Sequence, residues 1–241
     1  MIQIPAWLPA RVESAAQSTS HARILTLRVP GWRGNLPGQH LDVPLTVEDG
    51  YQAARSYSIA SSGQGDLVEL GVDRIVDGEV SPYLVDVAEP GDALEVKGPL
   101  GRAFVWHEDD PSPVQLIAGG SGVVPLIAMA RARAASPSAA PFRLLVSVRT
   151  PADAMFREEL ETLEHPGIEL TWVYTREAPA AWRGRVGRIS ADELAATTWS
   201  PAVRPLVYIC GPTGFVEAAA TAMVAHGHEM SRVRTERFGG T

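Results

Sequence analysis

Residues 114–125 read VQLIAGGSGVVP, and this stretch decides the class of fold. The apolar run at 114–118 has the length and composition of a buried strand. The glycine-rich turn after it leads into Pro125, which suits the first turn of a helix because its missing N–H has no partner there anyway. Such glycines let the backbone approach a phosphate at the positive end of a helix, although a tight structural turn explains them equally well. A strand, a turn and a helix in this order predict one unit of a parallel α/β sheet.

Downstream of this stretch the alternation continues. Apolar segments of strand length alternate with longer segments that have a helical pattern. Strands that alternate with helices predict a parallel sheet with helices packed on it. The expected strands are 142–148, 169–174 and 205–211, and the expected helices are 125–135, 152–163, 190–198 and 214–227.

Upstream, from about residue 11 to residue 104, short β-branched runs are separated by turns rich in Gly, Pro and Asp. This rhythm predicts an antiparallel barrel or sandwich. The polar segment 106–113, WHEDDPSP, predicts an exposed connection. We therefore expect two domains, an antiparallel β-barrel over residues 1–108 and a parallel-sheet α/β domain over residues 109–241. The expected strands of the barrel include 24–29, 40–47, 56–60, 67–72 and 93–98.

Charge and composition exclude several classes of function. The 241 residues carry a formal net charge of -7, so nothing draws the whole molecule to nucleic acid or to an anionic membrane. No stretch reaches the roughly 18 apolar residues that a membrane-spanning helix needs, and the amino terminus does not resemble a signal peptide. We expect a cytoplasmic protein. The single cysteine, Cys210, excludes an internal disulfide and a cysteine-ligated iron–sulfur cluster, and we expect no metal site in this chain.

A second strand-turn-helix unit lies at residues 207–214, VYICGPTG. It places Cys210 at the carboxyl end of a predicted parallel strand, which is the edge at which open α/β sheets bind ligands. Free cysteine is often a small core residue, and that alternative stays open here.

In the first domain, residues 55–58 read RSYS on a predicted strand. Alternation places Arg55 and Tyr57 on one side of the strand and Ser56 and Ser58 on the other. Arginine offers a fork for phosphate, and tyrosine offers a flat face for a heteroaromatic ring. The alternative for Tyr57 is ordinary barrel packing.

Residues 78–81, GEVS, precede a helical segment in the same domain. This helix start predicts a second place that accepts an anion. An ordinary N-cap at Ser81 explains the pattern equally well.

Six motifs in their order along the chain resemble the ferredoxin-NADP reductase superfamily, and the match covers nearly the whole sequence. The resemblance implies an FAD-binding barrel followed by an NAD(P)-binding α/β domain, with the nicotinamide meeting the flavin in the cleft between them. We expect no fused ferredoxin domain, in contrast to the oxygenase-reductase branch. The motifs are Arg55-Ser56-Tyr57-Ser58, Gly78-x-x-Ser81, Gly98-Pro99-Leu100-Gly101, Gly119 to Pro125, Cys210-Gly211-Pro212 and Glu236-Arg237-Phe238.

The resemblance also implies cofactor-binding roles. Arg55 would hold an FAD phosphate, Tyr57 would stack on the flavin, and Ser58 would lie near flavin N5. Further residues implied at FAD are Ser56, Gly78, Val80 and Ser81, and those implied at the nicotinamide dinucleotide are Gly120, Gly122, Gly211 and Pro212.

The candidate catalytic residues follow from the same resemblance. They are Ser58, Cys210 beside the nicotinamide C4, and Glu236 as the nearest acid. Phe238 would cover the flavin face that the nicotinamide must occupy, and because residues 239–241 follow it, we expect a movable cover. The alternative for Glu236 is a solvated surface carboxylate on a mobile tail.

The choice of nicotinamide cofactor rests on arginines. Arg149 follows the second strand of the α/β domain, where folds that favour NADH carry Asp or Glu. Thr175-Arg176-Glu177 resembles the Ser-Arg-Glu with which NADPH-dependent members bind the 2′-phosphate, and Arg185 adds a third charge. We expect NADPH, with NADH as the alternative. The arginines could instead be solvated or paired with Asp153 and Glu177.

Together these observations predict an FAD-dependent NAD(P)H oxidoreductase. Hydride would pass from nicotinamide C4 to flavin N5, and electrons would then pass to a separate ferredoxin, flavodoxin or oxygenase component. Two alternatives are a reductase of free flavin or another small molecule, and a non-catalytic FAD-binding subunit of a larger redox complex. The sequence names neither the acceptor, the direction of electron flow nor the oligomeric state. Candidates for receiving an acidic ferredoxin are Arg28, Arg33, Arg74 and Arg102.

Overall fold

The computed structural model describes residues 6–46, 52–163 and 167–238. The chain divides into two compact units between Val105 and Trp106, slightly before the expected boundary after residue 108.

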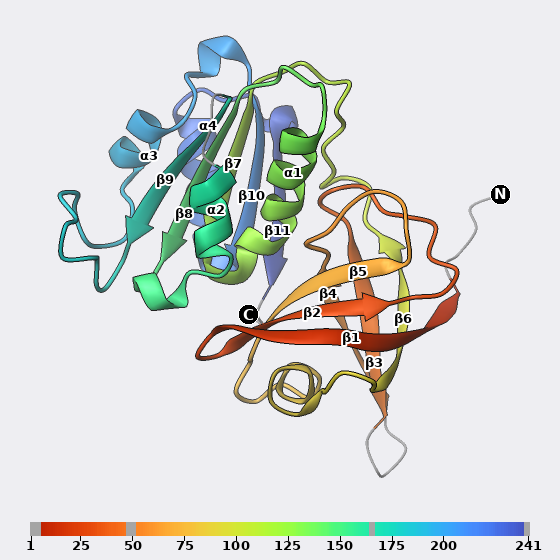
Figure 1. Cartoon of the computed structure of the whole chain (residues 1–241). Coiled ribbons are helices and arrows are strands. Elements are labelled where there is room, and N and C mark those ends of the chain that lie inside the picture. Colours follow the sequence, from red (N-terminus) through yellow and green to blue (C-terminus); the bar gives the residue numbers. More distant parts are fainter. Residues whose placement is uncertain (1–5, 47–51, 164–166, 239–241) are drawn as a thin grey trace. The chain divides into compact units, whose positions relative to one another are not determined.

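The first unit is a six-stranded antiparallel sheet with the strand order β4-β3-β6-β1-β2-β5 (Figure 1). An isolated bridge between Ile59 and Leu70 links the two outer strands, so the sheet curls toward a closed barrel around one core. This confirms the fold class expected for the amino-terminal half. The strands are β1 (Trp7–Thr19), β2 (Ala22–Arg28), β3 (His40–Thr46), β4 (Gln52–Ser58), β5 (Leu67–Asp73) and β6 (Ala93–Leu100), and the short helical segment η1 (Tyr83–Val87) follows β5.

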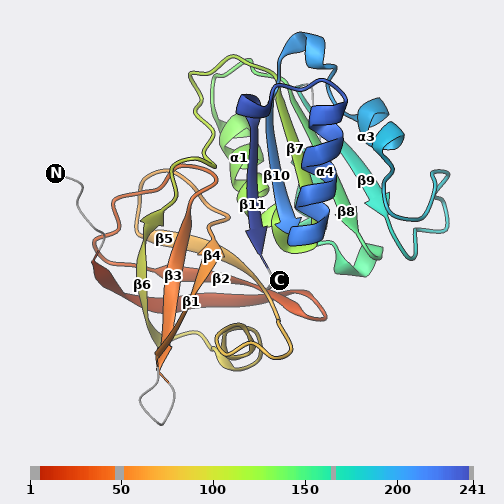
Figure 2. The ribbon, with the colours of Figure 1, turned by 180° about the vertical axis from the view of Figure 1, so that it is seen from behind.

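The second unit is a five-stranded parallel sheet with the strand order β11-β10-β7-β8-β9. Helices α1 and α2 cover one face, and α3 and α4 cover the other (Figures 1 and 2). This confirms the expected α/β fold class. The strands are β7 (Val114–Gly119), β8 (Phe142–Val148), β9 (Ile168–Tyr174), β10 (Leu206–Pro212) and β11 (Val233–Phe238), and the α-helices are α1 (Val123–Ala135), α2 (Arg157–Leu163), α3 (Ala191–Thr197) and α4 (Thr213–Ala225).

Three local findings refine the sequence interpretation. The connection at 106–113 is not exposed throughout, because Trp106 is 1% exposed and packs edge-on against Phe142 at 5.1 Å. The helix expected over 152–163 begins only at Arg157, because Phe156 has a left-handed backbone with φ of 57°. The carboxyl-terminal segment is a strand paired with β10, not the mobile tail that was the alternative for Glu236.

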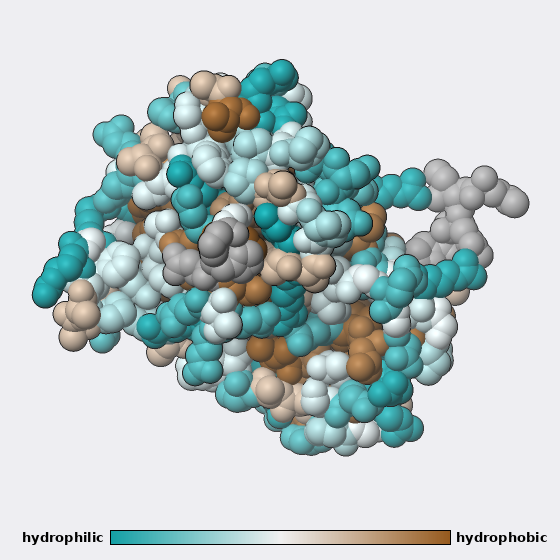
Figure 3. Space-filling view, turned by 45° about the horizontal axis from the view of Figure 1, so that its top comes forward, coloured by the Kyte–Doolittle hydropathy of each residue, from teal (hydrophilic) through white to brown (hydrophobic). Residues whose placement is uncertain are grey.

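Among the described residues, no helix has the length and apolar character needed to cross a membrane. On the face drawn in Figure 3, hydrophilic side chains predominate and apolar ones lie in scattered patches.

Candidate functional site

The glycine-rich turn of the second unit is shaped first by internal packing. It forms η2 (Gly120–Gly122) between β7 and α1. A Cβ on Gly122 would lie 2.1 Å from the Cys210 carbonyl oxygen, and one on Gly119 would lie 2.6 Å from the Phe215 ring. Gly120 differs, because its φ is 55° and a Cβ there would meet nothing within 4 Å. Of these three glycines, two permit close packing and Gly120 borders open space.

The turn leads into the amino-terminal end of α1. The N-cap residue of this helix is Gly122, which has no side chain to cover the first-turn amides, although the Val123 N–H donates to the Gly120 and Ser121 carbonyls. Amides at a helix start, together with the helix dipole, attract phosphate. The open backbone at Gly120 and the positive end of α1 therefore fit a dinucleotide pyrophosphate.

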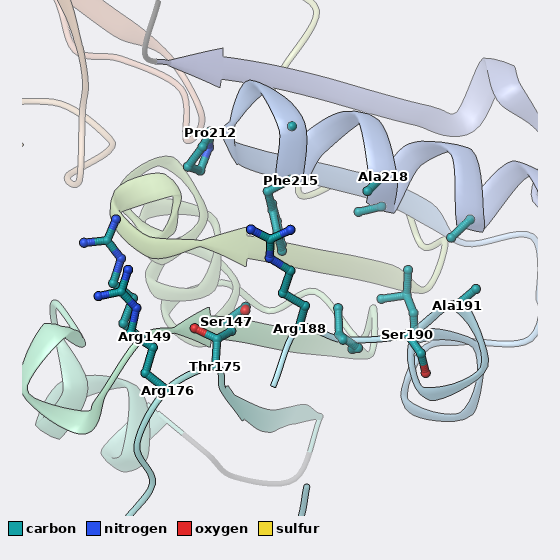
Figure 4. Close-up of a pocket in the computed structure, with 15 residues that line it drawn as sticks. Ser147, Arg149, Thr175, Arg176, Arg188, Ser190, Ala191, Pro212, Phe215 and Ala218 are labelled. Carbon is teal, nitrogen blue, oxygen red and sulfur yellow. The ribbon is translucent and has the colours of Figure 1, made fainter. Parts of the chain in front are cut away.

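A pocket of about 730 Å³ opens at the carboxyl edge of the parallel sheet. Its walls come from the ends of β8, β9 and β10, from α4 and from the segment that leads into α3 (Figure 4). Arg149 and Arg176 lie at one end, and Arg188 reaches toward Phe215. Of the residues predicted from the sequence, the pocket is lined by Arg149, Thr175, Arg176 and Pro212.

The positive charge at this end of the pocket is not neutralised. The backbone N–H of Arg176 donates to the Arg149 carbonyl at 2.9 Å, which fixes the two residues as neighbours. Within the described ranges, the guanidinium groups of Arg149, Arg176 and Arg188 form no ion pair, so the pairing with Asp153 and Glu177 that was the alternative is not seen. Many other arginines do pair with carboxylates. Unpaired arginines that line one pocket fit a phosphate group.

Arg188 was missed by the sequence interpretation, which chose Arg185 as the third cation. Arg185 lies outside the pocket lining. Its guanidinium donates to the Glu193 carboxylate at 2.8 Å and to the Arg188 carbonyl at 2.7 Å. The same Glu193 oxygen accepts the backbone N–H and the hydroxyl of Ser190 at 2.8 and 2.9 Å. The signal in the sequence was the capping box Ser190-x-x-Glu193, which fixes the carboxylate that holds Arg185.

The candidate catalytic residues of the second unit lie on neighbouring strands. Cys210 on β10 is the register partner of Glu236 on β11, and Pro212 is the partner of Phe238. Cys210 is 1% exposed. Burial raises the pKa of its thiol well above the ordinary value, and the Glu236 carboxylate raises it further. The thiol is therefore held protonated, which suits a small neutral wall rather than a nucleophile. Gly211 leaves room for the Phe215 ring, which would lie 2.9 Å from a Cβ at this position.

In the first unit, an ion pair joins the two motifs expected at FAD. The Arg55 guanidinium lies 2.8 Å from the Glu79 carboxylate, so β4 is tied to the 78–81 segment. In the described part of the chain, the backbone amides of Glu79 and Val80 donate to no protein acceptor. A guanidinium beside open amides fits a pyrophosphate. The Ser81 hydroxyl is not at this opening, because it accepts the Ile75 N–H at 3.1 Å and is buried.

The other residues of β4 that were predicted at FAD make contacts within the first unit. Ser56 donates its hydroxyl to Asp42 at 2.6 Å. Tyr57 packs partly against the barrel core, and burial raises the pKa of its phenol. Ser58 ends the strand as the register partner of His40. β4 forms no strand ladder with β5; the described hydrogen bonds to β5 come from the residues just after it, where Ala60 N–H donates to the Glu69 carbonyl at 2.7 Å.

Val80 and Gly78, the two remaining residues predicted at FAD, could meet a ligand only through their backbone. The Val80 side chain is fully buried in the barrel core, so only its amide faces the opening. Gly78 allows a tight turn, since a Cβ there would lie 3.0 Å from the Ser81 hydroxyl. No cluster of three or more His, Cys, Asp or Glu suited to a metal ion occurs among the described residues.

Two family models match the chain, one for each unit. Residues 9–105 match the oxidoreductase FAD-binding domain, and residues 116–221 match the oxidoreductase NAD-binding domain. The chain is 36% identical to ferredoxin–NADP reductase B of Sorangium cellulosum over 183 residues, which cover 72% of each protein. It is 32% identical to the glycine betaine monooxygenase reductase subunit of Chromohalobacter salexigens, over 85% of this chain and 56% of that protein.

Among solved structures, a cytochrome P450 reductase of Amycolatopsis superposes with a TM-score of 0.85 at 28% identity, over 99% of this chain and 72% of that one. The chain spans about half to three fifths of the length of several curated relatives that it matches.

Proposed function

Because this chain belongs to the ferredoxin-NADP reductase superfamily, we propose that it oxidises NADPH and delivers the electrons, through FAD, to a separate electron-transfer protein. Membership of this family shows that the chain is an NAD(P)H-dependent flavin oxidoreductase. Bound FAD supplies the chemistry that converts a hydride into electrons for an acceptor. The proposed part is the preference for NADPH and the nature of the acceptor.

The observation that carries the NADPH preference is the set of pocket arginines. Arg149 and Arg176 adjoin each other, Arg188 reaches in from another wall, and none of the three pairs with a carboxylate in the described chain. The extra 2′-phosphate of NADPH brings the negative charge that such a site lacks. NADH brings only two ribose hydroxyls to the same place, and β8 ends without the carboxylate that would bind them.

The residues near the ends of β10 and β11 would position the nicotinamide. Cys210 is buried and neutral, so it would place no charge behind the nicotinamide site. Glu236 is half-buried beside it and provides a carboxylate near the reacting end of the ligand. Phe238, which ends the described part of β11, provides an aromatic cover. These groups align rings and exclude water rather than transfer protons.

A separate protein acceptor is supported by what the relatives are named. Glycine betaine monooxygenase reductase subunit and aromatic O-demethylase reductase subunit are names of proteins that work with a partner component.

Anaerobic reduction tests the proposal directly. The purified protein is mixed in parallel with NADPH and with NADH while the flavin absorbance band is followed. We expect bleaching with both nucleotides at saturation and a much lower half-saturating concentration for NADPH. Equal half-saturating concentrations would contradict the NADPH preference, and a bound flavin that neither nucleotide reduces would favour the non-catalytic subunit.

A further inference from the structure

The connection between β9 and α3 brings Arg188 to the pocket without the support of regular secondary structure. Residues 175–190, all of them described, form no helix or strand, and we call them the β9–α3 loop. Figures 1 and 2 show this loop projecting beyond β9, the edge strand of the parallel sheet. Ordered loops of this length are uncommon in compact domains and usually serve a functional site. The path of the loop therefore needs a physical cause.

Tyr174, the last residue of β9, anchors the β9–α3 loop at two points. The Trp182 ring meets the Tyr174 ring edge-on, with centroids 5.0 Å apart and planes at 90°. The Gly187 N–H donates to the Tyr174 carbonyl at 2.9 Å. Tyr174 is 2% exposed and stacks on Trp172 at 6.2 Å, so it is a fixed anchor. The loop thus leaves β9 at Tyr174 and is tied back to the same residue immediately before Arg188.

Trp182 also shapes the turn that leads to this second anchor. Its backbone N–H donates to the Pro179 carbonyl at 2.8 Å, and its indole N–H donates to the Arg185 carbonyl at 3.3 Å. A Cβ on Gly184 would lie 2.7 Å from the Trp182 ring, so the chain passes very close to the indole. One side chain therefore fixes the turn on both sides and joins it to β9.

The other side-chain attachments described for the β9–α3 loop are weaker. Val186 is 44% exposed. Arg185 pairs with Glu193, but these side chains are 56% and 37% exposed, and exposed ion pairs stabilise a conformation little. An aromatic ring packed on a buried ring adds apolar burial and a preferred geometry. Trp182 is therefore the side chain that contributes most to the path of the loop.

We propose that Trp182 is a positioning residue for the choice of NADPH, because it holds the β9–α3 loop in the path that brings Arg188 into the pocket. The inference rests on the proposed function, in which Arg188 is one of three cations at the 2′-phosphate. Arg188 lines the pocket and Trp182 does not, so Trp182 acts through Arg188 rather than on the ligand. A cation already held in place loses less conformational freedom when the phosphate binds.

Kinetics with both nucleotides test this role. Trp182→Ala is compared with the wild type in steady-state reduction of a small neutral quinone by NADPH and by NADH. We expect the KM for NADPH to rise roughly three- to tenfold, the KM for NADH to stay within about twofold, and kcat at saturation to be unchanged. Trp182→Phe, which keeps an aromatic ring against Tyr174, should restore most of the affinity for NADPH.

A double variant separates positioning from direct binding. If Trp182 acts through Arg188, Trp182→Ala/Arg188→Ala should have a KM for NADPH within about twofold of that of Arg188→Ala, and not the product of the two single effects. Gly184→Ala should resemble Trp182→Ala, because the added Cβ displaces the ring. The matched control is Trp7→Ala, which removes a tryptophan that is 43% exposed in the first unit and should leave both KM values unchanged.

Denaturant titration of the same variants shows whether the second unit stays folded, and Gly184→Ala decides the question if Trp182→Ala does not fold. A folded Trp182→Ala with the wild-type KM for NADPH would overturn the positioning role. Multiplicative effects in the double variant, or equal rises in both KM values, would overturn it as well. A wild type with equal KM values for NADPH and NADH would instead defeat the proposed preference, and this inference would fall with it.

Discussion

The arginines expected at phosphate sites differ between the two units: the one in the first unit forms an ion pair, and those in the second unit do not. In the first unit, Arg55 is already held by Glu79 at 2.8 Å. In the second unit, Arg149 and Arg176 pair with no carboxylate in the described chain, although they line a pocket. An ion pair holds the arginine side chain in position before a ligand binds, but the paired carboxylate competes with the phosphate for the guanidinium. An unpaired arginine offers its full charge. The first arrangement suits a cofactor that stays bound through many other contacts, and the second suits a ligand that enters and leaves in each turnover.

The largest expected effect concerns the backbone that supports the second site. Gly122→Ala would place a Cβ 2.1 Å from the Cys210 carbonyl, so backbone must shift. We expect a loss of roughly 3 kcal/mol or more in the free energy of unfolding, measured by denaturant titration. Gly120→Ala should cost only about 1 to 2 kcal/mol, because its strain is confined to a left-handed φ in open space.

The same pair of variants separates folding from binding. Gly120→Ala should weaken binding of NADPH and NADH alike, because the added methyl would face the space where a pyrophosphate fits. If Gly122→Ala folded as stably as the wild type, the close approach of η2 to β10 would be refuted. If Gly120→Ala bound both nucleotides normally, the pyrophosphate would lie elsewhere.

The paired arginine gives the next prediction. Arg55→Ala should raise the Kd for FAD roughly 10- to 100-fold, because a charge-assisted bond to phosphate is lost. Glu79→Gln should keep FAD or bind it slightly more tightly, because a competing carboxylate is removed. Both Kd values can be measured by fluorescence titration of the apoprotein with FAD. Equal losses in both variants would mean that the ion pair supports the loop rather than the cofactor.

Neither substitution should unfold the first unit. The Arg55 and Glu79 side chains are 53% and 40% exposed. Exposed pairs stabilise proteins by roughly 1 kcal/mol or less, so the melting temperatures of the two apoproteins should stay close to that of the wild type. A large drop in either would show that loss of FAD follows from unfolding.

The unpaired arginines of the second unit predict selectivity for NADPH over NADH. Arg176→Ala should raise the KM for NADPH roughly 10- to 100-fold and leave the KM for NADH within about twofold, because only NADPH brings the 2′-phosphate. Steady-state reduction of a small quinone measures both constants. Inhibition by 2′-AMP should weaken in parallel, while inhibition by 5′-AMP should persist. An equal rise in both KM values would show that the 2′-phosphate does not bind at Arg176.

The sequence predicted most of the fold because its apolar segments are strongly periodic. β8 was expected over 142–148 and is found there, since its interior position buries six of its seven residues and five of the seven are apolar. β1 was not expected as a strand. Only three of its 13 residues are buried, so its pattern lacks a clear apolar face. β11 was also missed, because VRTERF carries three charges and forms the edge of the sheet.

The pocket residues that directly follow a strand could be predicted from the sequence. Those on the irregular segment that leads into α3 could not. Arg149 and Arg176 follow strands directly, so parallel pairing of β8 and β9 brings them together. Arg188 lies in an irregular segment, and only the three-dimensional path of that segment decides which of its arginines enters the pocket. The sequence interpretation chose Arg185, but the carboxylate of Glu193 holds that residue outside the lining.

The smallest predicted effect concerns Arg188, which lines the pocket in place of Arg185. Arg188→Ala should raise the KM for NADPH about tenfold with little change for NADH, because one of three cations is lost from the pocket. Arg185→Ala should change both KM values by about twofold or less, since that side chain only fixes the Arg188 carbonyl and the start of α3. Arg188→Lys should restore part of the NADPH preference, because the charge returns without the fork. If Arg185→Ala proved the more selective variant, the loop would rearrange on binding and bring Arg185 to the phosphate. The arrangement described here, with Arg188 unpaired in the pocket, would then be that of the free protein, and a different arrangement of the loop would select NADPH.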